Sequence, residues 1–577
     1  MQKSPQRVTA FSTTRLVSVA GVIAVLYVAV IVRLFFIQVV AHASYQVQAD
    51  RQHLGKSDTA ALRGEIFARD HTSDASPGLY QLAVNKKLYD ISLNPSLITQ
   101  PANTAEVISK ILGLPYDDVF ARAKKEHDVY EPIKDRVAAD VVDQLTASGL
   151  PGINVQEQVW RYYPDGDVGS QVLGFYGSDG DTKKGKYGIE GYWDKELAGL
   201  TSQALVPKDS KGNIIPESEK YFNLTADGSD VVLTIDRTIQ FKACDILKRG
   251  MDRFAADQAT VIVEESHTGK ILAMCGYPSF DPNNYGKVKS ISDFNNNAVF
   301  EAYEPGSVFK PIAMAAAIDQ HKVTPDTTYT DTGEVKIDTF TIRNFDKKAH
   351  GVNTMTQVLQ QSLNTGIIFA TKTIPNNVFT NYVKQFGFGT TTGVETSQEV
   401  AGSLGALEKN RDIYKATASF GQGITVTPLQ MLNGINALAN DGVLVRPYIV
   451  DEIRHVDGSV VTTQPKQLRQ VVSKAAAETL TAMLTRVVEE GYDSKATVKG
   501  YYLAGKTGTA QVAEDGKYRD KTNHTFVGYG PAENPKFSVL IKMYNVKNVG
   551  FAADSTTPLF SELAKFLLEY YHIPPTR

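Results

Sequence analysis

The chain has 577 residues, too many for a single hydrophobic core, and this length predicts roughly two to four domains. Its 42% hydrophobic and 21% charged residues are typical of a folded globular protein and exclude a largely disordered chain. The net charge of −3 offers no basic surface for nucleic acid, so no nucleic-acid partner is expected. The two cysteines, Cys244 and Cys275, cannot form a disulfide framework; we interpret both as small buried residues, with one bridge between them as the alternative.

The first predicted element is an apolar helix near the N-terminus. Residues 16–40 contain one charged residue, Arg33, and as a helix they would be about 37 Å long, enough to cross a hydrocarbon layer of about 30 Å. Three basic residues and no acidic one precede the run, which places the N-terminus in the cytoplasm: Lys3, Arg7 and Arg15. We therefore predict a cytoplasmic tail at 1–15, a single-pass anchor in the inner (plasma) membrane at 16–40, and an extracytoplasmic remainder. A cleaved signal peptide is the alternative.

The segment 42–225 is expected to form one loop-rich part of the molecule. Short strand-like runs alternate in it with amphipathic helical patches, and turn residues interrupt it repeatedly. The segment contains no internal repeat and no low-complexity tract. This mixture predicts an elongated α+β module.

A different pattern begins at residue 226. A strand is predicted at 231–235, followed by an amphipathic helix and by a hairpin at 259–277. A strand at 538–545 and a helix at 555–571 close the chain. Strands at both ends of this part, with Ala-rich helices between them, predict an antiparallel sheet packed by helices. The expected fold class is therefore α+β and multidomain.

The stretch around Ser307 carries the first chemical signal. Pro305 and Gly306 interrupt the chain just before an Ala-rich helical run, so Ser307 is predicted at a helix N-terminus with Lys310 one turn later on the same face. Burial in such a run would lower the pKa of the lysine, and a neutral amine can take the proton of a serine hydroxyl. The helix N-terminus favours negative charge developing near the serine. The alternative is a solvated lysine on a helix surface.

Two further motifs point to the same chemistry. Ser362 and Asn364 stand one residue apart before another apolar helical run. Lys506, Thr507 and Gly508 form the only Lys-Thr-Gly in the sequence, on a strand-like segment where the glycine would let a ligand's backbone approach closely. An edge strand with a solvated lysine is the alternative for this segment. Ser-x-x-Lys, Ser-Asp-Asn and Lys-Thr-Gly together are the signature of penicillin-binding proteins and class A β-lactamases.

The sequence resembles the class B penicillin-binding proteins, of the division-specific FtsI type, over nearly its whole length. The resemblance rests on segments at 63–70, 187–199, 228–240, 268–285, 303–311, 386–395, 420–431 and 506–541. It implies a pedestal (dimerisation-like) domain at 42–225 and a transpeptidase (penicillin-binding) domain at 226–577. One departure stands out: Ala68 and Asp70-His71 replace an Asp and an Asn-Gly of the pedestal motif. This departure puts a local pedestal contact in doubt, but not the chemistry.

The resemblance implies the following catalytic roles. Ser307 attacks the carbonyl between the two terminal D-alanines of a peptidoglycan stem peptide, and Lys310 takes the serine proton. Ser362 and Asn364 relay protons and orient the substrate amide. Lys506 supports the hydroxyl network.

The same resemblance assigns the binding groups. The hydroxyls of Thr507 and Thr509, next to Gly508, hold the terminal carboxylate of the substrate. The backbone N–H groups of Ser307 and Thr509 form the oxyanion hole, and one such donor is typically worth ~10²–10³ in rate. An amine of a neighbouring stem peptide then attacks the acyl-serine and forms the cross-link.

The implied partners are peptidoglycan stem peptides on glycan derived from lipid-linked precursors, β-lactam antibiotics, a membrane-embedded glycan polymerase and division proteins. No cofactor is implied, and none of the ten histidines forms a His-Glu-x-x-His metal motif. The absence of a Gly-x-Ser-x-Gly elbow argues against a Ser–His–Asp hydrolase. A β-lactamase would need a deacylating carboxylate, which the sequence does not locate. The alternatives that stay open are a membrane-anchored β-lactam sensor and an elongation-type transpeptidase.

Overall fold

The structure is a computed structural model that describes residues 13–36, 54–57, 61–70, 78–180, 182–200, 204–207, 226–514 and 517–577. The chain separates into two compact units, Met1–Ala61 with Leu200–Ala226, and Leu62–Gly199 with Asp227–Arg577. The second unit contains nearly all of the described residues and every candidate site residue.

The first unit contains one long helix and a short strand pair. Helix α1 covers Thr13–Phe35, and β1 (Leu54–Ser57) pairs antiparallel with β8 (Ala204–Pro207). Within the described part of the chain, no helix meets the combined length and apolarity that a membrane span requires. The structure therefore does not support the predicted anchor at 16–40, whose last residues, 37–40, lie outside the described part.

A seven-stranded sheet joins the N-terminal and C-terminal parts of the second unit. Its order is β18-β17-β9-β2-β3-β4, and β5 also pairs with β3. The strands are β2 (Ile66–Asp70), β3 (Gly78–Leu93), β4 (Glu131–Val137), β5 (Ile153–Tyr162), β9 (Asp230–Asp236), β17 (Val450–Arg454) and β18 (Val460–Thr462). Because β2 pairs in parallel with β9, the predicted pedestal and the predicted catalytic domain contribute strands to one sheet.

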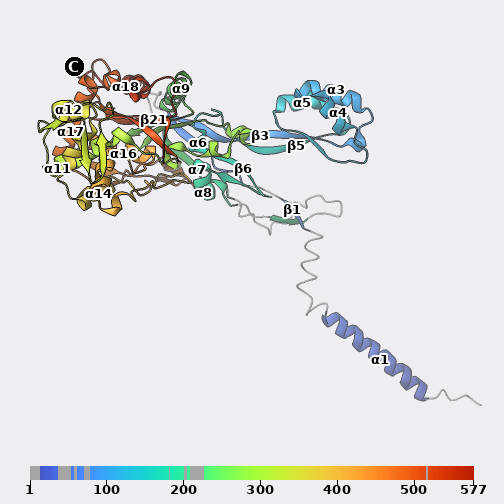
Figure 1. The fold of residues 1–577 in the computed structure, drawn as a ribbon. Helices are drawn as coiled ribbons and strands as arrows, with labels where there is room; N and C mark the ends of the chain where they lie inside the picture. The colour runs from blue at the N-terminus through green and yellow to red at the C-terminus, as the bar shows by residue number, and fades with distance from the viewer. Residues whose placement is uncertain are drawn as a thin grey trace, which may run out of the picture. The chain divides into compact units, whose positions relative to one another are not determined.

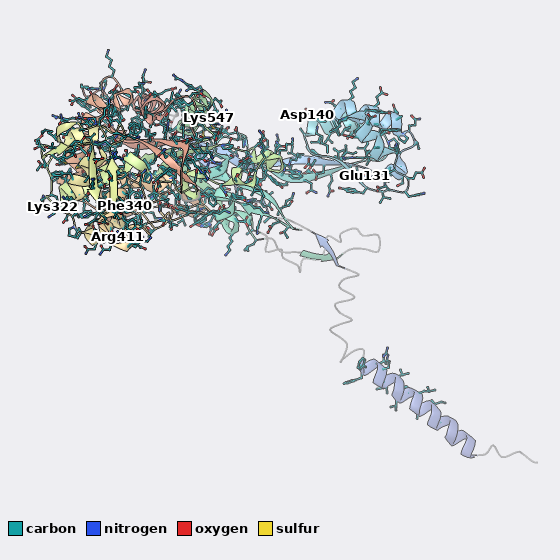
Figure 2. All side chains as sticks on the ribbon, in the orientation of Figure 1. Glu131, Asp140, Lys322, Phe340, Arg411 and Lys547 are labelled. Carbon is teal, nitrogen blue, oxygen red and sulfur yellow. A yellow bond between two sulfur atoms is a disulfide. The ribbon has the colours of Figure 1, made fainter. Side chains whose placement is uncertain are left out.

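A small group of helices, which we call the helical head, lies beside the C-terminal end of β3. Three helices gather there beside β3 and β5, as Figure 1 shows: α3 (Pro101–Leu112), α4 (Tyr116–Ala123) and α5 (Ala139–Ala147). Their apolar faces bury a separate core that includes Ile91, Ile108 and Leu145. Glu131 and Asp140 lie in this head (Figure 2).

A five-stranded antiparallel sheet forms the centre of the C-terminal part, in the order β11-β10-β22-β21-β20. The strands are β10 (Gln258–Glu265), β11 (Ile271–Tyr277), β20 (Ala504–Glu514), β21 (Lys517–Gly530) and β22 (Phe537–Tyr544). Helices α9 (Arg237–Phe254) and α18 (Thr556–Tyr570) share one core with this sheet. The prediction of an antiparallel sheet packed by helices is confirmed.

A second, larger core lies on the other side of the sheet and holds the helices that carry the candidate site. They are α11 (Lys310–Asp319), α12 (Met355–Gln360), α13 (Asn364–Thr371), α14 (Asn376–Gln385), α16 (Pro428–Ala439) and α17 (Lys474–Glu490). The first eight residues of α11 are all buried, which explains its run of alanines: small side chains let neighbouring helices pack closely around it. Lys322, Phe340 and Arg411 mark this lobe in Figure 2.

The two cysteines form a disulfide, which corrects our interpretation of them as unlinked buried residues. Cys244 lies on α9 and Cys275 on β11, with their Cα atoms 5.6 Å apart. Because α9 packs directly on β11, the two side chains meet although 31 residues separate them in sequence. The periodicity of the sequence predicts the helix and the strand, but it does not predict that they pack against each other.

Candidate active site

Ser307 lies on a tight turn that leads into α11. Residues Gly306–Phe309 form one turn of 3₁₀ helix, and the α-helix begins at Lys310. Gly306 has φ +61°, and a Cβ there would lie 2.9 Å from Cβ of Ala510, so only glycine fits this approach. The N–H of Gly306 donates to the carbonyl of Gly421 at 3.0 Å. The turn is thus held from β20 on one side and from the loop before α16 on the other.

Lys310 is fully buried one turn after Ser307. Its Nζ donates to the carbonyl of Ser362 at 2.5 Å and to Oγ of Ser362 at 3.1 Å. Burial, aided by the positive charge of Lys506, lowers the pKa of Lys310 well below its ordinary value. A shift of the pKa in this direction favours the neutral amine, which is the form that can accept a proton.

Ser362 lies between α12 and α13 and has a φ of +57°. A non-glycine residue in the left-handed region costs on the order of 1 kcal/mol, so the surrounding contacts hold the backbone in this conformation. Asn364 is the first residue of α13, and its Nδ2 donates to the carbonyl of Arg343 at 3.0 Å. The structure therefore brings Ser362 to Lys310, and Asn364 to the last residue of β14 (Phe340–Arg343).

The Lys-Thr-Gly segment lies on β20, the last strand of the five-stranded sheet. A Cβ at Gly508 would lie 3.0 Å from the carbonyl oxygen of Pro305 and 3.0 Å from Cγ1 of Val308. The glycine therefore admits the turn that carries Ser307, and not a ligand's backbone as we expected. This contact brings β20 against the turn that carries the serine.

Asp493 is a site residue that the sequence did not reveal. It is fully buried, and its Oδ2 lies 3.4 Å from Nζ of Lys506, which is itself 1% exposed. Oδ2 also accepts the N–H of Thr507 at 2.9 Å, and Oδ1 accepts the hydroxyl of Thr507 at 2.6 Å. Asp493 precedes Lys506 by 13 residues and belongs to none of the three motifs, so no sequence signal singled it out.

The contact to Asp493 also fixes the direction of the backbone groups along β20. Because the N–H of Thr507 points to Asp493, it points away from β21, the neighbouring strand. Backbone groups alternate in direction along an antiparallel strand, so Thr509, two residues on, also directs its N–H away from β21. Oγ of Thr509 accepts the N–H of Ala552 at 3.0 Å, which leaves its hydroxyl hydrogen available as a donor.

A cavity of about 870 Å³ opens beside these elements. Its lining brings together five of the predicted residues: Ser307, Ser362, Asn364, Thr507 and Thr509. Phe345 and Phe551, from two loops distant in sequence, also line it, and their rings meet edge to face with centroids 5.3 Å apart. Among the described residues, no group of three or more His, Cys, Asp or Glu side chains is arranged to hold a metal ion. Hydroxyls and outward N–H donors at one cavity, with a buried amine of lowered pKa bonded to Ser362, are suited to acyl transfer.

Comparison with known proteins gives matches over most of the chain. The family model described as the penicillin-binding protein transpeptidase domain matches residues 259–565, and the penicillin-binding protein dimerisation domain matches residues 58–233. Stage V sporulation protein D of Bacillus subtilis is 31% identical over 89% of this chain and 79% of its own length. Peptidoglycan D,D-transpeptidase FtsI of Buchnera aphidicola (Baizongia pistaciae) is 27% identical over 97% of this chain and 96% of its own.

The fold also matches solved structures. A crystal structure of penicillin-binding protein 3 from Mycobacterium tuberculosis in complex with aztreonam superposes with a TM-score of 0.69 and 26% identity. The match covers 90% of this chain and 98% of the other.

Proposed function

This chain belongs to the penicillin-binding protein transpeptidase family, and from that premise we propose that it cross-links peptidoglycan stem peptides as a serine-type D,D-transpeptidase. The observation that carries the proposal is the burial of Lys310 one turn after Ser307, with its pKa well below the ordinary value. Within the part of the chain that the structure describes, no ion pair joins Lys310 to a carboxylate; burial of such a lysine is costly, and a base role for its amine accounts for that cost.

In the proposed acylation step, Oγ of Ser307 attacks the carbonyl between the two terminal D-alanines. Nζ of Lys310 takes the hydroxyl proton, and the hydroxyl of Ser362, 3.1 Å from that Nζ, passes it to the nitrogen of the leaving D-alanine. The peptide bond breaks, free D-alanine departs, and an acyl-serine ester remains. In the second step an amine of a neighbouring stem peptide attacks the ester, gives its proton to Lys310 and forms the cross-link, which restores the hydroxyl of Ser307.

The binding groups follow from the edge of β20. The N–H groups of Ser307 and Thr509 would stabilise the oxyanion, because Thr509 directs its N–H away from β21. The free hydroxyl hydrogen of Thr509 would bind the terminal carboxylate. Asn364, which also lines the cavity, would orient the substrate amide. β-Lactams would acylate Ser307 by the same route, in keeping with the aztreonam complex of the mycobacterial relative.

The finer part of the proposal concerns location and cellular role. We propose that the catalytic domain acts outside the cytoplasm, held at the membrane through the N-terminal apolar segment, because its substrate lies there and because the Cys244–Cys275 disulfide suits an oxidising compartment. The matched families are a dimerisation and a transpeptidase domain, and the proposed partner that would polymerise the glycan is a membrane-embedded polymerase. Glu304 before Pro305, and the sequence Ser-Leu-Asn-Thr-Gly at 362–366, favour a septal over an elongation role.

Covalent labelling tests the proposal. A fluorescent penicillin should label the purified protein, peptide mapping should place the acyl group on Ser307, and Ser307→Ala should abolish the label. Ser292→Ala, a serine on the exposed turn Ile291–Phe294, is the matched control and should label normally. Retained labelling of Ser307→Ala would contradict the assignment of the nucleophile.

Two further measurements separate the alternatives. Cross-linking of donor and acceptor stem peptides distinguishes an enzyme from a β-lactam sensor, which would be labelled but would form no cross-links. Depletion in cells should give elongated cells without septa and the protein at midcell. Rounded cells that still divide would instead indicate an elongation-type enzyme.

A further inference from the structure

Asp493 is a buried carboxylate beside the proposed binding site for a substrate carboxylate, a position that needs an explanation. It is fully buried, and Thr507, which it holds, lines the cavity. Two negative charges so close together would repel unless one is balanced. Lys506 balances it, because the two form an ion pair with a distance of 3.4 Å between Nζ and Oδ2.

The contacts of Asp493 also determine the state of Thr507. The hydroxyl of Thr507 donates its only hydrogen to Oδ1 of Asp493 at 2.6 Å, and its N–H donates to Oδ2 at 2.9 Å. A hydroxyl that gives its hydrogen to Asp493 has none to give to a ligand carboxylate. Thr509 is the neighbouring residue whose hydroxyl hydrogen is available, because its oxygen accepts the N–H of Ala552.

Asp493 also affects Lys310, through Lys506. The charge of Lys506 is one of the two causes that lower the pKa of Lys310, and burial is the larger one. Asp493 holds the ammonium group of Lys506 in place, so it also fixes the position from which that charge acts. Asp493 is thus connected to the proposed base through Lys506 and to the anion-binding edge of β20 through Thr507.

We propose that Asp493 is a positioning residue of the transpeptidase site: it fixes Lys506 and Thr507 and balances the positive charge of Lys506, so that ligand carboxylate recognition rests on Thr509. Asp493 acts through these two residues and touches no reacting atom. This inference rests on the proposed function. It adds a residue outside the three motifs and predicts that binding and acylation respond to its loss in opposite directions.

Asp493→Asn is the variant that tests the inference, because it removes the charge and keeps the shape. The acylation rate constant k2 and the dissociation constant Ks are measured by stopped flow for benzylpenicillin and for its uncharged methyl ester. With Lys506 no longer balanced, Ks for benzylpenicillin should fall roughly three- to tenfold, and Ks for the ester should not change. The k2 should fall at least about tenfold for both ligands, because Lys506 is no longer held.

Two variants complete the experiment. Asp493→Glu keeps the charge but displaces the carboxylate, so k2 should fall for both ligands while Ks for benzylpenicillin does not tighten. Glu264→Gln replaces another fully buried carboxyl group, which is bonded to Asn436 away from the cavity, and should change neither constant. If the Asn variant does not fold, the Glu variant carries the test, and wild-type constants for it would refute the inference.

The outcomes distinguish this inference from the function on which it rests. If benzylpenicillin does not acylate the wild-type protein, the proposed function fails. If acylation is normal but Asp493→Asn moves Ks for the acid and for the ester in parallel, or leaves k2 unchanged, the assignment of Asp493 alone fails. If Ks rises and k2 falls for both ligands, Asp493 only stabilises the fold and is not a positioning residue.

Discussion

Two clusters of buried charge in this protein are built in opposite ways. The first lies where β5 meets the helix α7 (Gly188–Tyr192), and it centres on Glu190. Glu190 is fully buried between Arg63, at 2.6 Å, and Arg161, at 2.7 Å. Burial alone would raise the pKa of Glu190, but the two guanidinium charges more than offset it, and the pKa lies below its usual value. Each arginine meets a carboxylate there, so the cluster keeps its charges.

The second cluster lies beside the cavity and contains two buried lysines, Lys310 and Lys506, with one buried carboxylate, Asp493. Asp493 is paired with Lys506, and Lys310 has hydrogen bonds to Ser362. Burial and the charge of Lys506 therefore lower the pKa of Lys310. A buried group with an opposite charge beside it stays ionised and contributes to structure, whereas a buried group without one becomes neutral and is available for proton transfer.

The largest effect, on the acylation rate, should come from replacing Lys310 by a residue that stays positively charged. A guanidinium group stays protonated, so Lys310→Arg cannot accept the proton of Ser307 and should lose acylation by on the order of 10³-fold or more. Stopped-flow acylation with a fluorescent penicillin measures this. In the wild-type protein, the acylation rate should decline as the pH falls through the lowered pKa of Lys310, because the protonated amine is inactive.

Lys415 offers a matched control for this substitution. It is also buried, and burial lowers its pKa although Asp412 lies 3.8 Å away; its Nζ donates to the carbonyls of Lys372 and Ile374, away from the cavity. Lys415→Arg should therefore acylate at a rate close to that of the wild-type protein. Equal losses in the two variants would show that Lys310 is only a structural lysine.

The first cluster should respond in stability and not in chemistry. Glu190→Gln leaves Arg63 and Arg161 buried without their shared carboxylate, and should lower the free energy of unfolding by about 3–5 kcal/mol. Chemical denaturation measures the loss, and the acylation rate per folded molecule should not change. Asp179→Asn, in an exposed ion pair with Lys184, is the control and should have no measurable effect on stability. A slower acylation in Glu190→Gln would mean that the two clusters are coupled.

The sequence predicted the parts of this comparison that depend on local spacing. Ser307 and Lys310 are three residues apart on one turn, so their proximity follows from helical geometry alone. The strand character of 504–514 and the hairpin β10–β11 also follow from short-range alternation. These features need no knowledge of how distant segments pack.

The rest depends on contacts between distant segments. Asp493 reaches Lys506 only because the chain folds back before β20, and Phe345 meets Phe551 across 206 positions of sequence, from two separate loops. Gly508 was predicted to admit a ligand and instead admits the turn of Ser307, because strand periodicity does not say what packs against a strand. The Cys244–Cys275 bond was only the alternative in the sequence analysis for the same reason.

Glu264 extends the comparison to acidic groups: it is a buried carboxyl group that forms no ion pair with any lysine or arginine among the described residues. Asn436 Nδ2 donates to it at 3.0 Å, and burial raises its pKa to about 8. The folded protein therefore binds this proton more tightly than the unfolded chain, so the stabilisation is full below about pH 4.5 and declines as the pH rises to about 8. Between about pH 4.5 and pH 8 the wild-type protein should lose up to about 4 kcal/mol of unfolding free energy through this group, and Glu264→Gln should not show that loss. Denaturation at several pH values measures the difference. An unchanged pH dependence would show that a cation reaches Glu264.

The smallest expected effect concerns His524, a buried imidazole on β21 opposite Thr509. Its ring nitrogens bond to the hydroxyls of Ser555 and Thr522, and burial lowers its pKa to about 4 despite the nearby charge of Asp554. The unfolded chain binds the proton more readily, so this stabilisation is full above about pH 6.5 and is lost as the pH falls. Between pH 7 and pH 5 the wild-type protein should lose about 2 kcal/mol that His524→Gln does not lose, as measured by urea denaturation at both pH values. Replacing the exposed His127 by Gln should leave the pH dependence intact, and the same flattening in both variants would remove His524 as its source.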